Sequence, residues 1–132
     1  MEQVKISIIT ITYNSERTVE ETLKSVISQA YPNLKYIIVD GASKDKTLDV
    51  VAKYKDSIAR IISEPDKGIA DAFNKGIRMA TGDLIGIINS DDLLLPGALR
   101  KMAESYDGET DVYRGNTVIS NLVSQFRCRE IP

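Results

Sequence analysis

The feature of this sequence that most limits its fold is a regular alternation of two kinds of apolar segment. Short β-branched runs are typical of buried strands. They occupy residues 4–12, 34–39, 57–62, 83–88 and 111–119, with a last strand reaching residue 128. Between them, apolar residues recur every three or four positions, which predicts helices. These helices cover residues 15–30, 47–55, 68–81 and the stretch from residue 96. The pattern predicts an α/β fold, with a mainly parallel sheet and helices on both faces.

Local signals predict where the helices begin and end. Ser15 is expected to cap the first helix, and Pro32 to stop it. Gly82 is expected directly after the third helix, and Pro96 at the first position of the fourth. The chain shows no repeat or linker, and its 132 residues predict a single domain.

Composition excludes several kinds of chemistry and partner. The chain has no histidine and a single cysteine, so a Ser-His-Asp triad, a His-ligated zinc and an internal disulfide are excluded. The formal net charge of −2 gives no sign of nucleic-acid binding. No apolar stretch is long enough for a transmembrane segment or reads as a signal peptide, so a cytoplasmic location is expected.

Polar residues follow four of the predicted strands. They are Thr12-Tyr13-Asn14, Asp40-Gly41-Ala42-Ser43, Glu64 to Gly68, and Asn89-Ser90-Asp91-Asp92. In a parallel sheet the carboxyl ends of the strands meet at one edge, where ligands bind in open α/β sheets. We therefore expect these residues to form a single site.

The fourth strand end predicts a divalent metal. Asp91 and Asp92 are neighbouring carboxylates in a half-buried place, where like charges are costly unless a cation neutralises them. Oxygen ligands suit Mg²⁺ or Mn²⁺, held by one or two carboxylates together with substrate phosphates, and Asn89 offers a further oxygen. The alternative is that Asp91 or Asp92 caps the helix after Pro96.

The first two strand ends offer groups for a flat polar ligand. Tyr13 can flank a base, although an isolated tyrosine is more often part of the core. Asn14 and Ser15 are equally well explained as caps. Asp40 can accept hydrogen bonds from a ligand, or it can form a tight turn. We expect the Asp40 carboxylate to pack little, so that its removal barely affects folding.

Residues 66–76 combine a flexible backbone with polar side chains. Gly68 lets the backbone approach a ligand closely. Asp71 shares one helix face with Asn74 and Lys75. This face either meets a ligand or is a solvated surface with an Asp71–Lys75 ion pair. Aspartate and asparagine are mildly unfavourable inside helices, which favours the first interpretation.

In this order, these motifs resemble the family 2 glycosyltransferases, which use nucleotide sugars and have the GT-A fold. The resemblance covers residues 4–116 and is carried by residues 7–14, 37–45, 66–76, 80–83, 89–92 and 96–99. It implies a glycosyltransferase enzyme, for which the inner face of the membrane is an expected location besides the cytoplasm. The enzyme would transfer a sugar from a UDP-type donor to a saccharide or lipid-linked acceptor in polysaccharide or glycoconjugate synthesis, with inversion.

The resemblance also implies roles for particular residues. Thr12, Tyr13 and Asn14 would lie by the uracil ring, and Asp40 would accept its N–H. The segment with Gly68, Asp71, Asn74 and Lys75 would line the diphosphate and the donor sugar. Asp91 and Asp92 would hold Mg²⁺ or Mn²⁺, joined by Asn89, which stands where the family often has aspartate.

The resemblance predicts a donor-binding part only. Family members usually continue past the fifth strand into an acceptor-binding part with the general base, and no residue of this chain is assigned that role. We therefore expect residues 1–132 to form one nucleotide-sugar-binding domain, whose open sheet edge can promote self-association. The alternatives are a non-catalytic nucleotide-sugar-binding module and, last, a nucleotidyltransferase-like enzyme. No P-loop motif is present.

Overall fold

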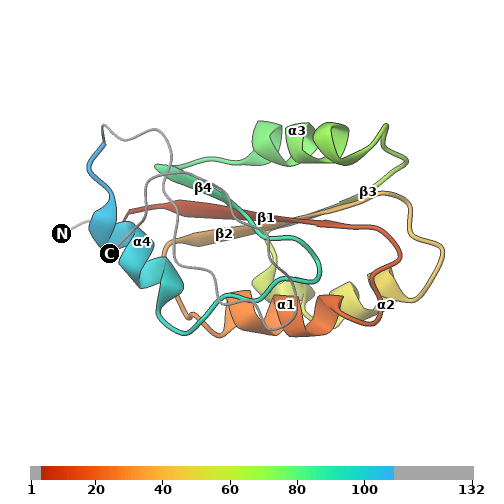
Figure 1. Cartoon of the computed structure of the whole chain (residues 1–132), viewed down its shortest axis with the longest axis horizontal. Helices are drawn as coiled ribbons and strands as arrows, with labels where there is room; N and C mark the ends of the chain where they lie inside the picture. Colours follow the sequence, from red (N-terminus) through yellow and green to blue (C-terminus); the bar gives the residue numbers. More distant parts are fainter. Residues whose placement is uncertain (1–3, 109–132) are drawn as a thin grey trace, which may run out of the picture.

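The computed structural model describes residues 4–108, in which strands and helices alternate along the chain as predicted (Figure 1). The strands are β1 (Ile6–Thr12), β2 (Leu34–Asp40), β3 (Arg60–Ser63) and β4 (Leu84–Ile87). The helices are α1 (Val19–Ile27), α2 (Thr47–Ala52), the 3₁₀ helix η1 (Lys55–Ser57), α3 (Ile69–Met79) and α4 (Ala98–Ser105). The strands expected over residues 111–119 and up to residue 128 lie outside the described residues. In the range that is described, no helix has both the length and the apolar character needed to cross a membrane.

The four strands form one sheet in the order β3-β2-β1-β4, and all three pairs are parallel. The prediction of a mainly parallel sheet is confirmed for this part of the chain. The register places Thr12 opposite Asp40, and Asp40 opposite Ser63. The carboxyl ends of β1, β2 and β3 therefore lie side by side, as a ligand site at this edge requires.

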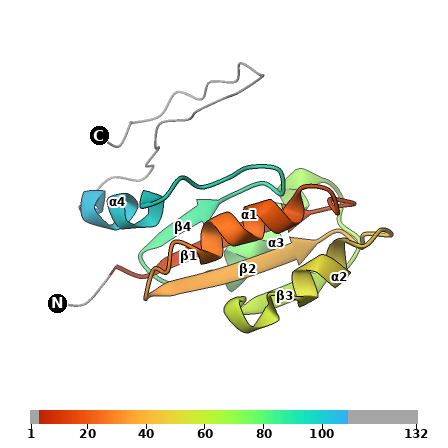
Figure 2. The same cartoon turned by 90° about the horizontal axis from the view of Figure 1, so that it is seen from below.

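Helices cover both faces of the sheet. Figure 1 shows α3 on one face and α1 with α2 on the other, and Figure 2 shows α1 lying along β1 and β2. Each strand contributes to both cores because its side chains alternate between the faces. Ile8 packs in the core that also contains Leu23 of α1 and Leu99 of α4, whereas Ile9 packs with Ala72 of α3. The expected helices on both faces are confirmed.

One glycine brings α3 close to the sheet. A β-carbon at Gly76 would lie 2.5 Å from Cγ2 of Ile9, which is too close for an ordinary contact. Gly76 therefore lets α3 lie directly on β1. This close packing fixes where the amino end of α3 meets the carboxyl ends of the strands.

Several element ends differ from the sequence prediction. Ser15 does not cap α1, because α1 begins only at Val19, after a turn in which the Ser15 carbonyl accepts hydrogen bonds from the N–H groups of residues 18 and 19. Gly82 does not directly follow α3, which ends at Met79. Pro96 lies two residues before α4. The third strand begins at Arg60 rather than at residue 57, because residues 55–57 form η1.

Candidate functional site

A cleft of about 700 Å³ lies at the carboxyl ends of the strands. Segments that follow β1, β2, β3 and β4 contribute to its walls. Six of the residues proposed from sequence line this cleft: Thr12, Tyr13, Asn14, Gly68, Asn89 and Asp91. Five others are not among its lining residues: Asp40, Asp71, Asn74, Lys75 and Asp92. A second hollow of about 360 Å³ shares Tyr13 and Asp66 with the first.

The charges of the cleft are mainly negative. Of the lining residues in the described part of the chain, four are carboxylates and one, Arg17, is a cation. The carboxylates belong to Glu16, Asp45, Asp66 and Asp91. An anionic ligand in this cleft would be repelled unless a cation accompanied it. The charge balance thus suits a phosphate-containing ligand only together with a bound metal ion.

Tyr13 and Asn14 lie at the rim of the cleft. Tyr13 is 59% exposed, so it is not a core tyrosine. Asn14 has a φ of 47°, a left-handed conformation that asparagine tolerates better than most residues. Its N–H donates to Ser43 Oγ over 2.8 Å, and its Oδ1 accepts from the Lys44 N–H over 2.9 Å. Asn14 therefore ties the end of β1 to the loop after β2.

Asp40 is wholly buried and its carboxylate is fully engaged within the protein. Oδ1 accepts hydrogen bonds from the hydroxyls of Thr12 and Ser43, over 2.7 and 2.6 Å. Oδ2 accepts from the Ser43 N–H and the Ser63 hydroxyl, both over 2.8 Å. The expectation that this carboxylate packs little is wrong. Four donors fill the four acceptor positions of a carboxylate, so Asp40 joins the ends of three strands.

Asp66 occupies the space that a side chain at position 41 would take. A β-carbon on Gly41 would lie 2.6 Å from Asp66 Oδ2 and 3.5 Å from Cδ1 of the Tyr13 ring. Asp66 Oδ1 accepts from the Gly68 N–H over 3.1 Å. The absence of a side chain at Gly41 thus places a carboxylate oxygen beside the exposed tyrosine. The sequence does not assign a role to Asp66. It does place the segment of Asp66 directly after the third predicted strand, where site residues are expected.

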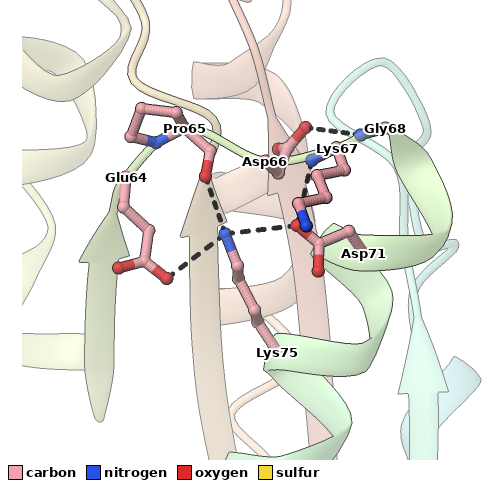
Figure 3. Close-up of polar contacts among 7 residues, drawn as sticks. All are labelled: Glu64, Pro65, Asp66, Lys67, Gly68, Asp71 and Lys75. Carbon is pink, nitrogen blue, oxygen red and sulfur yellow. Dashed lines mark hydrogen bonds and ion pairs between the residues drawn. The ribbon is translucent and has the colours of Figure 1, made fainter.

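Asp71 and Lys75 of α3 hold the segment that carries Asp66 (Figure 3). Lys75 Nζ donates to the Pro65 carbonyl over 3.0 Å and pairs with Glu64 at 3.2 Å and Asp71 at 3.5 Å. Asp71 Oδ2 also accepts from the Lys67 N–H over 2.9 Å. The i,i+4 ion pair that the sequence left open is therefore present. Within the described residues, Lys75 and Asp71 bind Glu64, Pro65 and Lys67. These contacts fix residues 64–68.

The same contacts shift the acidity of this pair. The backbone hydrogen bond from Lys67 lowers the pKa of Asp71, and the nearby Lys75 charge acts in the same direction. Partial burial by itself lowers the pKa of Lys75, but the hydrogen bond to Glu64 and the Asp71 charge outweigh it, so that the pKa is raised. Both groups are therefore charged over the whole neutral range.

We expect Asp71 to make the fold sensitive to acid. Folding lowers the pKa of Asp71, so Asp71 stabilises the fold fully at a pH above its unfolded-state pKa. This stabilisation is lost as the pH falls through the folded-state pKa. Urea midpoints measured from pH 6 to pH 2 should therefore fall more steeply for the unmodified chain than for Asp71→Asn. The difference between the two midpoints should therefore be largest near pH 6 and should begin to shrink below about pH 4.

Asp49 is an exposed carboxylate on α2, and Asp49→Asn is the matched control for this experiment. It should follow the curve of the unmodified chain. Parallel curves for the unmodified chain and Asp71→Asn would contradict the assigned role of Asp71.

Asn89–Asp92 form a turn, in which the Asp92 N–H donates to the Asn89 carbonyl over 3.1 Å. Asn89 and Asp91 line the cleft. Neither aspartate caps a helix, because α4 has Gly97 at its N-cap and no side-chain cap bond. The helix-cap alternative is thus wrong.

The donor set at this turn fits a hard divalent ion bound jointly with a ligand. Among residues 4–108, no three acidic, histidine or cysteine side chains are grouped closely enough to hold a metal alone. One or two carboxylates and an amide oxygen leave several positions of an octahedral ion open. A diphosphate would fill positions that this turn leaves open.

Two solved glycosyltransferases of the GT-A type share this arrangement of elements. One is Staphylococcus aureus TarS (residues 1–349), solved in complex with UDP-GlcNAc. The match covers 76% of this chain and 30% of the TarS chain, with 30% sequence identity and a TM-score of 0.71. The mannosyltransferase PcManGT from Pyrobaculum calidifontis, in complex with GDP-Man and Mn²⁺, matches 78% of this chain and 31% of its own, with 30% identity and a TM-score of 0.67. The fold is thus of the GT-A type.

The sequence identifies the family within this class. Residues 7–129 match the family model of Glycosyl transferase family 2, and the chain belongs to this family. The Escherichia coli UDP-Glc:alpha-D-GlcNAc-diphosphoundecaprenol beta-1,3-glucosyltransferase WfgD is 33% identical over 133 residues, which cover 94% of this chain and 53% of WfgD. The curated relatives that the chain matches are longer, and it spans between about one third and just over one half of their length.

Proposed function

We propose that this chain is the donor-binding part of an enzyme that transfers a sugar from a nucleotide sugar, with a UDP-sugar favoured. The acceptor would be a saccharide or a lipid-linked saccharide in polysaccharide or glycoconjugate synthesis. The observation that carries this proposal is the cleft at the strand ends, with four carboxylates and one arginine around an exposed tyrosine. The UDP-GlcNAc complex of TarS supports it.

The nucleobase would lie against Tyr13, over the hollow bounded by Gly41 and Asp66. Uracil presents an N–H donor between two carbonyl oxygens and therefore needs an acceptor from the protein. The four acceptor positions of Asp40 are already used, so it has none left for this N–H. Asp66 Oδ2 is a carboxylate oxygen beside the tyrosine ring, and we assign the recognition of the uracil N–H to Asp66.

The diphosphate would lie between the amino end of α3, at Gly68, and the Asn89–Asp92 turn. Asp91 and Asn89 would hold a Mg²⁺ or Mn²⁺ ion there, and Asp92 would lie beside them. The Mn²⁺ complex of PcManGT supports a divalent ion. When bound, the ion supplies Lewis-acid neutralisation of the leaving nucleoside diphosphate. Gly68 leaves room for the phosphates, because nothing lies within 4 Å of where its β-carbon would be. The transfer would invert the anomeric carbon, and no general base is assigned among residues 4–108.

The proposal is tested by titrating the chain with UDP and with CDP in the presence of Mn²⁺, using the Asp66→Asn variant. Cytosine has an acceptor nitrogen where uracil has its N–H. A carboxylate therefore favours UDP, whereas an amide can donate to the cytosine nitrogen. Asp66→Asn should lower UDP affinity by roughly tenfold, the loss typical of one charge-assisted hydrogen bond, and should narrow the preference over CDP.

Glu16→Gln is the matched control, because it removes one negative charge from the same cleft without touching the second hollow. It should keep the preference for UDP. Equal UDP and CDP affinities in the unmodified chain would contradict the role of Asp66, and no binding of either nucleotide would overturn the donor-binding proposal as a whole.

A further inference from the structure

Helix α1 carries a polar stripe on the side that meets the segment between β4 and α4. Thr22, Ser25 and Gln29 follow one another at spacings of three and four residues, which place them along one side of a helix and its continuation. Thr22 is wholly buried, in a helix whose other buried side chains are Val19, Leu23 and Val26. A buried hydroxyl in such a place requires a hydrogen-bond partner.

All three side chains bind the backbone of residues 90–99. Thr22 Oγ1 lies 2.9 Å from the Ser90 carbonyl oxygen and 2.7 Å from the Asp92 carbonyl oxygen. Ser25 Oγ accepts from the N–H of residue 94 over 3.1 Å. Gln29 donates to the carbonyl of residue 95 over 2.9 Å and accepts from the N–H of residue 99 over 3.3 Å. Five contacts thus join α1 to this segment.

The Thr22 contacts enclose a single residue, Asp91. The hydroxyl of Thr22 shares its proton between the carbonyl oxygens of the residues before and after Asp91, so it holds the peptide groups 90–91 and 92–93 in place. A threonine inside a helix commonly donates to a carbonyl of its own preceding turn. Thr22 donates instead across to the turn that carries the candidate metal ligands. The direction of the Asp91 side chain therefore depends on α1.

We propose that Thr22 is a positioning residue for the divalent ion, acting through the backbone of Ser90 and Asp92 on the direction of the Asp91 carboxylate. This inference rests on the proposed function, in which Asp91 holds the ion with a nucleoside diphosphate. Ser25 and Gln29 extend the same support toward α4. Groups that orient a metal ligand from behind typically change metal affinity by about 10- to 100-fold when they are lost.

The test measures Mn²⁺ affinity directly, by electron paramagnetic resonance of free Mn²⁺ in the presence of saturating UDP. Thr22→Val keeps the shape of the side chain and removes the hydroxyl, and it should weaken Mn²⁺ binding by roughly tenfold. UDP affinity measured in EDTA should not change, because Thr22 does not line the cleft. Thr22→Ser restores the hydroxyl and should restore Mn²⁺ affinity.

Thr10→Val is the matched control for lost stability. Thr10 is equally buried, and its hydroxyl hydrogen-bonds Tyr36 over 2.8 Å rather than the backbone of the Asn89–Asp92 turn. It should lower the melting temperature and keep Mn²⁺ affinity. If Thr22→Val does not fold, Ser25→Ala at a half-buried position decides the question, and it should weaken Mn²⁺ binding in the same direction by less.

Two results would overturn the inference, and they are distinguishable. Unchanged Mn²⁺ affinity in folded Thr22→Val, or in Ser25→Ala where that variant decides, would remove the positioning role and leave the proposed function intact. Absence of UDP-dependent Mn²⁺ binding in the unmodified chain would overturn the inference together with the metal-dependent part of the proposed function.

Discussion

Asp40→Ala is expected to lower the free energy of unfolding by about 2–4 kcal/mol, because it leaves buried donors without their acceptor. The carboxylate accepts four hydrogen bonds, from Thr12, Ser63 and, twice, Ser43. Hydrogen bonds to a charged group contribute more than neutral ones, and their effects are not additive. Urea unfolding of the variant and the unmodified chain at pH 7 measures the difference.

Asp49→Ala, at an exposed position of α2, is the control for Asp40→Ala and should change stability little. UDP affinity should fall in Asp40→Ala only as far as the cleft loses order, because no acceptor position of Asp40 faces a ligand. If instead the variant unfolds like the unmodified chain and loses UDP affinity alone, Asp40 is a ligand-binding residue whose protein hydrogen bonds are exchanged on binding.

The sheet could be predicted from sequence because its signal is local and repeated. Ile6, Ile8 and Tyr36 face one core and Ile9 and Ile37 face the other, so buried strands read as continuous apolar runs rather than as alternation. Helices between such runs leave few topologies other than a parallel sheet covered on both faces. No single segment of the sequence predicts the strand order β3-β2-β1-β4, because this order depends on how the segments pair with one another.

Element ends were harder to predict, because tertiary contacts compete with local caps. Ser15 looks like an N-cap, but its Oγ contacts Ser90 over 2.8 Å and its N–H donates to Thr47 over 2.7 Å. The chain therefore makes a turn after β1 and starts α1 only at Val19. Pro96 could open a helix, but Gly97 adopts a φ of 80° and delays the start to Ala98.

The candidate site was predictable where a residue follows a strand, and not where its role depends on a contact across the fold. Tyr13 and Asp91 follow strands and line the cleft. Asp40 also follows a strand, but whether its carboxylate faces a ligand or the protein is set by Ser63, which lies 23 residues later. Thr22 follows no strand and no motif, and its partners lie about 70 residues away, so nothing in the sequence near Thr22 could have found it.

The second large effect is expected for Asp91→Ala, which should remove the metal dependence of UDP binding. Asp91 is the one carboxylate of the Asn89–Asp92 turn that lines the cleft. Without it this turn offers the cleft only the neutral oxygens of Asn89 and Ser90, which are too weak to hold a hard cation between the protein and a diphosphate. In Mn²⁺, UDP affinity should fall by about tenfold or more, which corresponds to about 1.4 kcal/mol. In EDTA it should match that of the unmodified chain.

Asp92→Ala is the matched control, since Asp92 is exposed, adjacent and absent from the cleft lining. It should keep a clear response to Mn²⁺. Isothermal titration of the three proteins with UDP, each in Mn²⁺ and in EDTA, gives the six affinities that are needed. If the unmodified chain binds UDP equally well in both conditions, the Asn89–Asp92 turn holds no ion. Because Asp91 caps no helix, an Asp91 that binds no metal would leave Arg17 as the cation among the four carboxylates of the cleft, and the diphosphate would have to be bound elsewhere.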